Sequence, residues 1–316
     1  FRRLFLRAAN THGKIRAITL RACIHKRGIR SVNTNSDFQK GPAKMIYRMD
    51  RLPEDSINPI TQRGYDRSWI ILMLTGSKEY QKMCGGNGCA YTIKISRAKC
   101  RDWEMAVCDC IGFCTANQKN LILVMTEAEL SAAKIRYGGH SYKEPVLRES
   151  EPAVLVHSTP MDSWEQIKYD GTLKSWNLLK AEKVISEEQP IGIQLGDPED
   201  FSNYIMFGSG VTGEIVVSAK QRGKIVMDVN AEYRTGARLY FDAKRMAQDG
   251  LLLRDGCHLK VKDVLPLAPY LIWAATWDTA GLASQVSVPR IFAEQADRQF
   301  QAIFSQYLQD TEGSKG

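Results

Sequence analysis

Three histidines downstream of residue 44 mark positions where the sequence places groups suited to proton transfer or ligand binding. His140 follows two glycines and lies four residues after Arg136, whose planar guanidinium suits a phosphate. His157 ends an apolar run just before a predicted helix, where backbone N–H groups point at an anion. His258 lies in a turn-like stretch. Each motif alone is equally typical of a structural turn, so the order of the motifs carries the prediction.

Six of the eight cysteines lie between Cys84 and Cys114. Four thiolates suffice for a tetrahedral zinc site, but the spacing lacks the paired Cys-x2-Cys motif that is typical of one. Cys89 and Cys100 border the predicted strand 90–96, where a free cysteine packs as a small hydrophobic residue. The modest cysteine content of this long chain favours reduced thiols. We therefore predict free thiols and no metal ligands, with a structural metal in this cluster as the alternative.

The order and spacing of the first two histidine motifs resemble those of the NAD-dependent RNA (tRNA) 2′-phosphotransferase family. That family has Ile-Arg-Ala-x-Gln-Gly-His-Ser followed by Leu-Tyr-His-Gly-Thr, and this chain has similar runs over 135–141 and 154–159. Residues 239–253 resemble the family's strand-Asp-helix-Asp-Gly-Ile segment, and residues 255–259 resemble its Asn-Gly-Val-Ile-Leu strand. The resemblance covers about residues 134–268.

This resemblance implies an ADP-ribosyltransferase-like fold, a split and mostly antiparallel sheet that holds NAD in a cleft. The family removes a splicing-derived 2′-phosphate from RNA, such as tRNA, by transferring it to ADP-ribose with release of nicotinamide. Such a transferase needs cations around an anionic nucleophile more than it needs a strong base. NAD and 2′-phosphorylated RNA are therefore the expected cofactor and partner.

The resemblance also assigns roles to residues, which we expect to converge on one cleft. Arg136 is expected to bind the 2′-phosphate or the NAD phosphates, and His157 with Thr159 to hold the ribose and pyrophosphate region. A further arginine precedes the strand that starts near residue 239, and Arg234 fits its spacing better than Arg238. The expected catalytic residues are Arg136, His157 and Arg234, and the expected cofactor-binding residues are His140, Ser141, Thr159, Tyr204 and Arg238.

The sequence also departs from the family pattern. The catalytic Leu-Arg-His motif of the family is absent between residues 45 and 130, and Ser158 replaces the glycine of His-Gly-Thr. Residues 203–207 replace the Arg-x-His-Ile-His strand, and residues 208–233 resemble an insertion. Two alternatives therefore stay open. One is an ADP-ribosyltransferase of the same fold that acts on DNA, protein or a small molecule, and the other is a non-catalytic module that binds RNA or nucleotides.

A stretch rich in proline and charge over residues 143–152 predicts a domain boundary near 145. The preceding domain, residues 45–145, is predicted to be α+β, and the NAD-binding domain, residues 146–285, to be mostly sheet with small helices. Residues 286–316 are predicted to form an amphipathic C-terminal helix and tail, because apolar side chains recur at helical spacing at Phe300, Ile303, Phe304, Tyr307 and Leu308. The individual predicted strands are 69–74, 91–95, 121–125, 153–157, 191–195, 204–207, 213–218, 224–228 and 238–242. The predicted helices start at Thr126, Asp162 and Asp242, with capping boxes at Thr126 and Asp162, and the helix from Asp162 is expected to run to Asp170 and to end at Gly171.

The formal charge of +8 is confined to the N-terminus. Residues 1–44 contain 11 Lys and Arg against one Asp, whereas residues 45–316 contain 32 basic and 34 acidic side chains. This basic leader is typical of an organelle transit peptide, but a disordered arm or a stretch translated ahead of Met45 has the same composition. We expect a cytoplasmic protein, or an organellar one if the leader is a transit peptide. Apolar runs are far shorter than the roughly 18 residues of a membrane span, which excludes a membrane-spanning protein.

Overall fold

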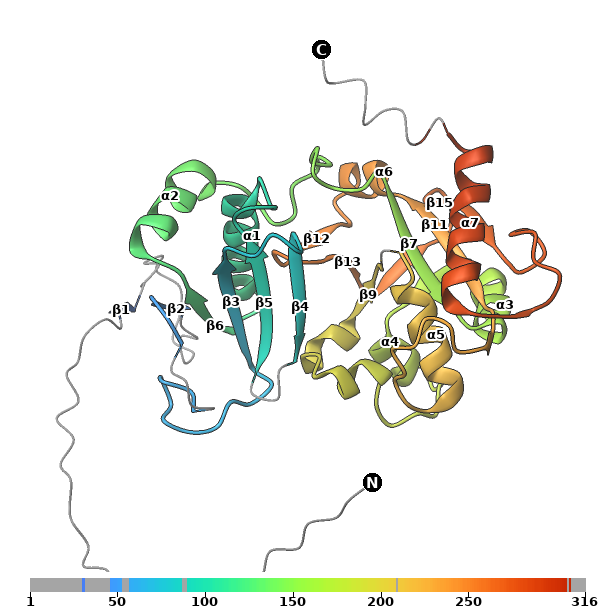
Figure 1. Cartoon of the computed structure of the whole chain (residues 1–316), viewed down its shortest axis with the longest axis horizontal. Helices are drawn as coiled ribbons and strands as arrows, with labels where there is room; N and C mark the ends of the chain where they lie inside the picture. The colour runs from blue at the N-terminus through green and yellow to red at the C-terminus, as the bar shows by residue number, and fades with distance from the viewer. Residues whose placement is uncertain are drawn as a thin grey trace, which may run out of the picture.

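The computed structural model describes residues 30–31, 46–52, 57–86, 90–208, 210–305 and 307. Most of the basic leader therefore lies outside the described residues, and so does the prediction made for it. The described elements form two units side by side, each with its own sheets and helices (Figure 1). This mixture of helices and several sheets confirms the α+β class that the sequence predicts.

The N-terminal unit is built on one six-stranded sheet. In spatial order its strands are β1 (Arg30–Ser31), β2 (Ile46–Met49), β6 (Asn120–Val124), β3 (Trp69–Thr75), β5 (Tyr91–Ser96) and β4 (Lys82–Gly86). The four inner strands run parallel, while β1 and β4 run antiparallel at the two edges. Inner parallel strands are covered on both faces, which explains why Ile70, Ile71 and Leu72 of β3 are all buried.

Two helices, α1 (Trp103–Ala116) and α2 (Glu127–Tyr137), pack on one face of this sheet. The start of α2 agrees with its sequence signal, because the Thr126 side chain accepts a hydrogen bond from the Glu129 amide and Glu129 accepts one from the Thr126 amide. The strands predicted at 69–74, 91–95 and 121–125 are confirmed as β3, β5 and β6.

Three cysteines fill the core between the helices and the sheet. Cys100, Cys110 and Cys114 have no exposed surface and pack with Phe113. The expectation that Cys100 packs as a small hydrophobic residue is therefore confirmed, whereas Cys89 lies outside the described residues. All six cysteines among the described residues are free thiols.

The C-terminal unit contains two three-stranded antiparallel sheets. One has the order β15 (Leu271–Ala275), β11 (Ala237–Asp242) and β7 (Val154–Thr159); the other has β12 (Leu253–Arg254), β13 (Leu259–Lys262) and β9 (Tyr204–Met206). A bridge between Val156 of β7 and Gly208, two residues after β9, joins the two sheets. The remaining short elements are β8 (Thr172–Lys174), β14 (Val264–Pro266), β10 (Tyr233–Arg234), β16 (Val286–Ser287), α4 (Trp176–Ala181) and η2 (Glu199–Asn203).

Two of the strands predicted in this unit are wrong and prove to be 3₁₀ or irregular backbone. Residues 191–195 form a 3₁₀-helix, η1 (Ile191–Leu195), which follows Pro190 and ends at Gly196 with a left-handed φ of 77°. Residues 224–228 form no strand, and Met227 is 66% exposed, so this apolar run has no sheet face to bury it. Apolar β-formers predicted strands here, but no neighbouring strand pairs with them.

The strand predicted over 213–218 is also wrong, because these residues lie in the helix α5 (Thr212–Arg222). Helical spacing places Glu214, Val217 and Ser218 on one buried face, against β7. Packing of that face outweighs the β-propensity of the valines. The strands predicted at 204–207 and 238–242 are confirmed as β9 and β11.

The two predicted small helices exist, although one starts differently. In α6 (Ala243–Gln248) the Asp242 carboxylate accepts the Arg245 amide at 2.9 Å, the cap that the sequence predicts. α3 (Met161–Asp170) ends at Gly171, as predicted, with a left-handed φ of 66°. The capping box predicted at Asp162 is wrong, because the helix starts one residue earlier behind Pro160.

The predicted C-terminal helix is α7 (Pro289–Ile303), and it packs on the core. Its Phe300 ring stacks on Tyr240 of β11 with centroids 4.4 Å apart. The helix ends at Ile303, so Phe304, which the helical pattern included, lies beyond it. Among the described residues, no helix is both long and apolar enough to cross a bilayer.

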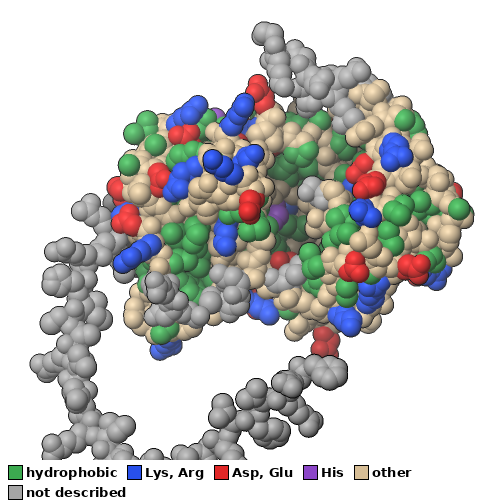
Figure 2. Space-filling model, viewed as in Figure 1, with side chains coloured by type: hydrophobic (Ala, Val, Ile, Leu, Met, Phe, Trp, Pro, Cys, Tyr) green, Lys and Arg blue, Asp and Glu red, His purple; other side chains and the backbone are tan. Residues whose placement is uncertain are grey.

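The two units share part of one core. The connection between α2 and β7 contains the predicted boundary at 145, but Phe201, Tyr204 and Leu253 pack in the same cluster as Phe113 of α1. The most buried charge of this junction is Lys260, whose ammonium lies 3.9 Å from the centre of the Phe113 ring. Figure 2 shows a hollow between the two units with a histidine side chain inside it.

Candidate functional site

His157 lies where the two sheets of the C-terminal unit part, at a place we call the β7–β9 fork, formed by β7 and β9. Its Nδ1 donates to the Met206 carbonyl of β9 at 2.9 Å, which bridges the two sheets. Burial lowers the pKa of His157 to about 4, so the imidazole is neutral near pH 7. Because Nδ1 carries the proton in this bond, Nε2 is left as a hydrogen-bond acceptor. Thr159, two residues on, shares the same face of β7 and is buried.

Ser158 faces the other side of β7, away from His157. Its hydroxyl donates to the Glu214 carboxylate of α5 at 2.5 Å. Gly213 permits this contact, because a Cβ there would lie only 2.5 Å from the Ser158 hydroxyl oxygen. Ser158 therefore supports β7 from behind and places no side chain beside His157.

Arg238 belongs to that buried support and not to a ligand site. Its guanidinium makes a two-pronged ion pair with Asp297 of α7, at 2.9 and 3.0 Å, and also reaches Glu214 at 3.4 Å. Arg238 is 1% exposed and Glu214 is fully buried, where Tyr233 also donates to it at 2.7 Å. The expectation that Arg238 contacts a cofactor is corrected, because its donors are used inside the fold.

The residues predicted around Arg136 lie elsewhere. Arg136 is on α2, at the far end of the N-terminal unit from β7 (Figure 1), and its exposed side chain pairs with Glu104 of α1 at 2.9 Å. His140 is exposed and bonds Glu144 at 3.1 Å, and Ser141 is exposed in the same turn. The expected convergence of Arg136 and His140 with His157 is therefore wrong.

Of two further predicted residues, Arg234 lies apart from the fork, whereas Tyr204 belongs to β9 but directs its hydroxyl to α1. Arg234 is exposed on β10, where its guanidinium bonds Gln285 at 3.3 Å. Tyr204 is buried, and its hydroxyl donates to Asn117 of α1 at 3.3 Å. Of the eight predicted site residues, only His157 and Thr159 share one face of β7 beside the fork. The sequence motif identified this strand, but it could not show where the segments of the other six residues lie in space.

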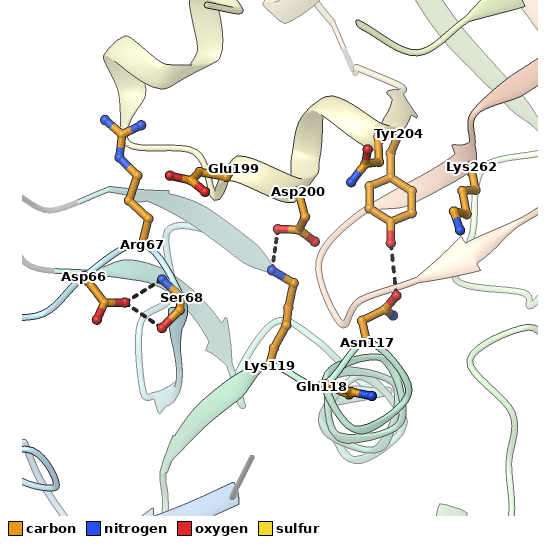
Figure 3. Close-up of a pocket in the computed structure, with 11 residues that line it drawn as sticks. Asp66, Arg67, Ser68, Asn117, Gln118, Lys119, Glu199, Asp200, Tyr204 and Lys262 are labelled. Atoms are coloured by element: carbon orange, nitrogen blue, oxygen red, sulfur yellow. Dashed lines mark hydrogen bonds and ion pairs between the residues drawn. The ribbon is translucent and has the colours of Figure 1, made fainter. Parts of the chain in front are cut away.

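Tyr204 instead lines a polar pocket between the two units (Figure 3). The pocket has a volume of about 590 Å³. Lys119 pairs with Asp200 across it, and its basic and acidic side chains are equal in number, so it offers no excess of positive charge to a phosphate. Its lining consists of Asp66, Arg67, Ser68, Asn117, Gln118, Lys119, Glu199, Asp200, Asn203, Tyr204 and Lys262.

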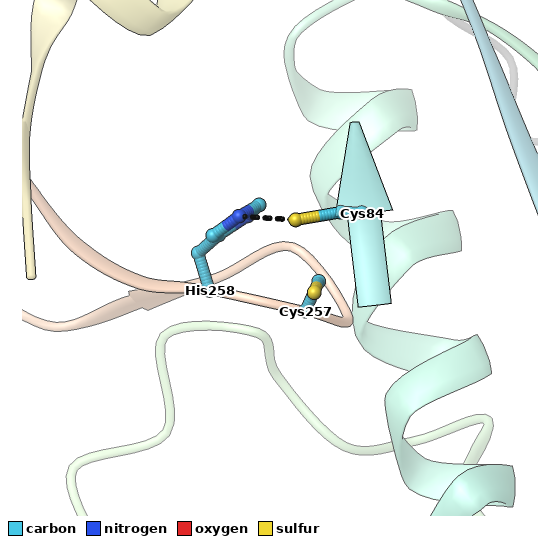
Figure 4. Close-up of side chains that lie close together, drawn as sticks. All are labelled: Cys84, Cys257 and His258. Atoms are coloured by element: carbon cyan, nitrogen blue, oxygen red, sulfur yellow. Dashed lines mark hydrogen bonds between the residues drawn. The ribbon is translucent and has the colours of Figure 1, made fainter. Parts of the chain in front are cut away.

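A second concentration of reactive groups lies where β4 meets the turn between β12 and β13 (Figure 4). We call it the thiol–imidazole cluster; its members are Cys84, Cys257 and His258. The Cys84 sulfur lies 3.0 Å from Nε2 of His258, a contact between residues 174 positions apart in the sequence. All three side chains are partly exposed, so the cluster is accessible from outside the core.

Electrostatics make Cys84 the most acidic thiol of the cluster. A hydrogen bond from Cys257 and the nearby His258 lower the pKa of Cys84 to about 4, against the opposing effect of burial. Burial lowers the pKa of His258, but Asp255 and Cys84 outweigh it and raise that pKa to about 10. A thiolate beside an imidazolium suits either nucleophilic chemistry or metal ligation.

Asp255 orients the imidazole of this cluster. Its carboxylate accepts a hydrogen bond from Nδ1 of His258 at 3.0 Å. It also accepts hydrogen bonds from the backbone amides of Cys257 and His258, at 3.0 and 2.7 Å. The fully buried Lys260 donates to the same carboxylate at 2.5 Å. The sequence signal for this site is the short run from Asp255 to His258. Cys84 comes from the other unit, and its sequence position groups it with the cysteines up to Cys114, not with Cys257.

Comparisons with protein-family models, curated proteins and solved structures found no match to this chain.

Proposed function

We propose that the C-terminal unit is an ADP-ribosyltransferase-like domain that uses NAD, releases nicotinamide and transfers ADP-ribose to an acceptor. The observation that carries this is the fork itself, where two antiparallel sheets part and His157 bridges them through the Met206 carbonyl. A split antiparallel sheet with a histidine at the end of its first strand is the arrangement that the family resemblance implies.

The chemistry of the fork suits a ribose. A neutral His157 offers Nε2 as an acceptor, which a ribose hydroxyl can satisfy as a donor. Thr159 on the same face adds a hydroxyl at the end of β7. Ser158, which stands where the family has a glycine, points to Glu214 and does not stand beside His157 on this face. His157 and Thr159 are therefore the residues that would hold the nicotinamide-bearing part of NAD.

The acceptor is the weaker part of the family resemblance. An RNA 2′-phosphate requires cations beside the reacting ribose, but Arg136 pairs with Glu104 and Arg238 pairs with Asp297. Lys220 of α5 is a cation whose charge reaches His157, but an ammonium does not supply the planar donor fork of an arginine. The displaced arginines therefore favour the alternative in which the same chemistry serves another acceptor, such as DNA, protein or a small molecule.

The test is to incubate the full chain with NAD and to measure nicotinamide release by chromatography. We expect release by the wild type, and His157→Ala to reduce it on the order of 100-fold, as for loss of one preorganised contact. His140→Ala is the matched control, because His140 is exposed on the other unit, and it should keep the wild-type rate. Wild-type protein that neither binds NAD nor releases nicotinamide would refute the proposal.

The acceptor is tested in the same assay by adding 2′-phosphorylated RNA, unmodified RNA, DNA or protein. If, among these acceptors, only 2′-phosphorylated RNA yields a cyclic ADP-ribose phosphate, the function is the 2′-phosphotransferase activity that the resemblance implies. Labelled ADP-ribose on DNA or protein would identify the other acceptor class.

A further inference from the structure

We propose that Cys84, Cys257 and His258 bind a zinc ion that links the N-terminal unit to the C-terminal unit. The three side chains each offer one ligand atom, and these atoms all lie within 4.8 Å of one another. Two thiolates and one imidazole are a common zinc donor set, and three protein ligands leave a fourth position for another donor. This inference is independent of the proposed NAD chemistry, because His157 is not part of the cluster.

The second thiol distinguishes a metal site from a thiol nucleophile. A nucleophile activated by a base requires one cysteine and one histidine, with a third group that orients the base. Cys84, His258 and Asp255 meet that need without Cys257. Cys257 nonetheless places its sulfur within 4.8 Å of the other two ligand atoms, and a metal ion is the ligand that uses all three side chains.

The Cys84–His258 pair needs only a small movement to admit the ion. Zinc binds sulfur at about 2.3 Å and nitrogen at about 2.0–2.1 Å, which separates two tetrahedral ligand atoms by about 3.5–3.8 Å. The Cys84 sulfur and the His258 Nε2 are 3.0 Å apart, so this pair must open by about half an ångström. Cys84 lies on the edge strand β4, which has a neighbouring strand on only one side.

Asp255 supplies the outer support that a zinc-bound histidine requires. It accepts Nδ1 of His258 at 3.0 Å and thereby directs Nε2 at the two sulfurs. Two backbone amides hold the same carboxylate, at 2.7 and 3.0 Å, and Lys260 neutralises it. Zinc would displace the Nε2 proton of the imidazolium to solvent, while Asp255 holds the proton on Nδ1 and so keeps the ring in the orientation that ligation uses.

The charges around the cluster accommodate a dication. Two thiolates and Zn²⁺ sum to zero, and Asp255 is already balanced by Lys260. The other ionisable groups that act on the cluster are Tyr91, whose hydroxyl lies 3.4 Å from Nε2 of His258, Asp197, which interacts electrostatically with His258, and Lys82 of β4, whose charge acts on Cys257. Lys82 is the positive charge among them, and it favours the Cys257 thiolate that zinc ligation requires.

The first experiment measures metal in the full chain purified under reductant. We expect about one equivalent of zinc, and Co²⁺ substitution should produce a thiolate-to-cobalt charge-transfer band and tetrahedral d–d bands. Cys84→Ser, Cys257→Ser and His258→Gln should each weaken zinc binding beyond the roughly 10–100-fold typical of losing an outer partner. Cys108→Ser is the control, because Cys108 is also partly exposed but bonds only the Ala133 carbonyl, and it should bind zinc normally.

The second experiment keeps the wild-type sequence, so it does not depend on whether a variant folds. Alkylation of the reduced protein is followed peptide by peptide with mass spectrometry, with and without added Zn²⁺. Zinc should protect Cys84 and Cys257 and leave Cys108 unchanged. Failure of the reduced wild type to bind zinc, combined with rapid alkylation of Cys84 at any zinc level, would overturn the metal site and identify Cys84 as a nucleophile. A Cys84–Cys257 disulfide in protein that binds no zinc after reduction would overturn it in favour of a redox pair.

Discussion

The β7–β9 fork and the thiol–imidazole cluster are assembled in opposite ways. The fork comes from one unit, and an ion network of the buried Arg238 and Glu214 with the partly exposed Asp297 supports β7 from behind. The cluster comes from both units, is partly exposed, and depends on Asp255 and Lys260 for its support. A local sequence motif is therefore sufficient to locate the fork, whereas the cluster exists only because distant segments meet.

The difference also concerns charge. At the fork the histidine is neutral and its Nδ1 is bonded to the Met206 carbonyl, so the site presents an acceptor and a hydroxyl, with Lys220 as a charged neighbour. At the cluster a thiolate lies beside a cationic imidazole, so the site presents charge-bearing ligands. The first suits an uncharged sugar and the second suits a metal ion or an electrophile.

The largest expected effect is on the support behind the fork. Arg238→Ala removes the guanidinium that balances the fully buried Glu214, and we expect a loss of about 3–5 kcal/mol in the free energy of unfolding. Urea denaturation measures this loss. Arg234→Ala, an exposed arginine four residues earlier, is the control and should change stability by less than about 0.5 kcal/mol. Equal stabilities of the two variants would mean that β7 does not depend on the ion network.

Local sequence signals explain which parts of the fold were predictable. The cap at Thr126 and the stop at Gly171 depend on residues within four positions, and both are confirmed. α5 was missed because its residues favour strands, and only the contacts of Glu214 with Ser158 and Tyr233 reveal why it is helical. Such contacts join segments that no local pattern connects.

The same reasoning explains the candidate sites. His157 could be found because its strand and the following helix carry the motif, but its partner Met206 is 49 positions away. Arg136 was expected near it on the same motif order, yet it lies in a helix of the other unit. Cys84 and His258 could not be paired, because no sequence rule places β4 beside the β12–β13 turn.

The second prediction concerns pH and compares the two histidines. His157 has a pKa lowered to about 4 in the folded chain, so below about 6.5 the unfolded chain binds a proton that the folded chain does not. The contribution of neutral His157 to the free energy of unfolding is complete above pH 6.5. It is lost as the pH falls toward 4, and the total loss is at most about 3 kcal/mol. Between pH 7 and 5 we expect the wild type to lose about 2 kcal/mol more than His157→Gln.

Urea denaturation at both pH values provides the measurement for this prediction. The difference between the two proteins isolates His157, because His258 titrates equally in both. Its pKa is raised, so its contribution is complete below pH 6.5 and does not fall in this window. An identical acid loss in both proteins would show that His157 is solvated at the fork.

A smaller effect is expected where α5 contacts β7. In Gly213→Ala the new Cβ would lie 2.5 Å from the Ser158 hydroxyl oxygen and 2.9 Å from its Cβ, so the helix must shift. Such overpacking costs about 1–3 kcal/mol. Gly139→Ala is the matched control, because nothing lies within 4 Å of a Cβ there. A thermal melt of both variants checks this, and equal melting temperatures would mean that the contact of α5 with β7 is loose.

The smallest effect is expected for substitution of Arg136, which tests whether the N-terminal unit takes part in the reaction. Arg136 is 63% exposed and pairs only with Glu104 of the described residues, so Arg136→Ala should change stability by less than about 0.5 kcal/mol. If Arg136 is only a surface ion-pair partner, nicotinamide release from NAD should also stay near the wild-type rate. If Arg136 instead bound a phosphate in the transition state, both Arg136→Ala and Arg136→Lys would lose roughly 100-fold or more in rate with unchanged stability. Measuring the rate and the melting temperature of both variants side by side decides between these outcomes, since only a moving N-terminal unit would bring α2 to the fork.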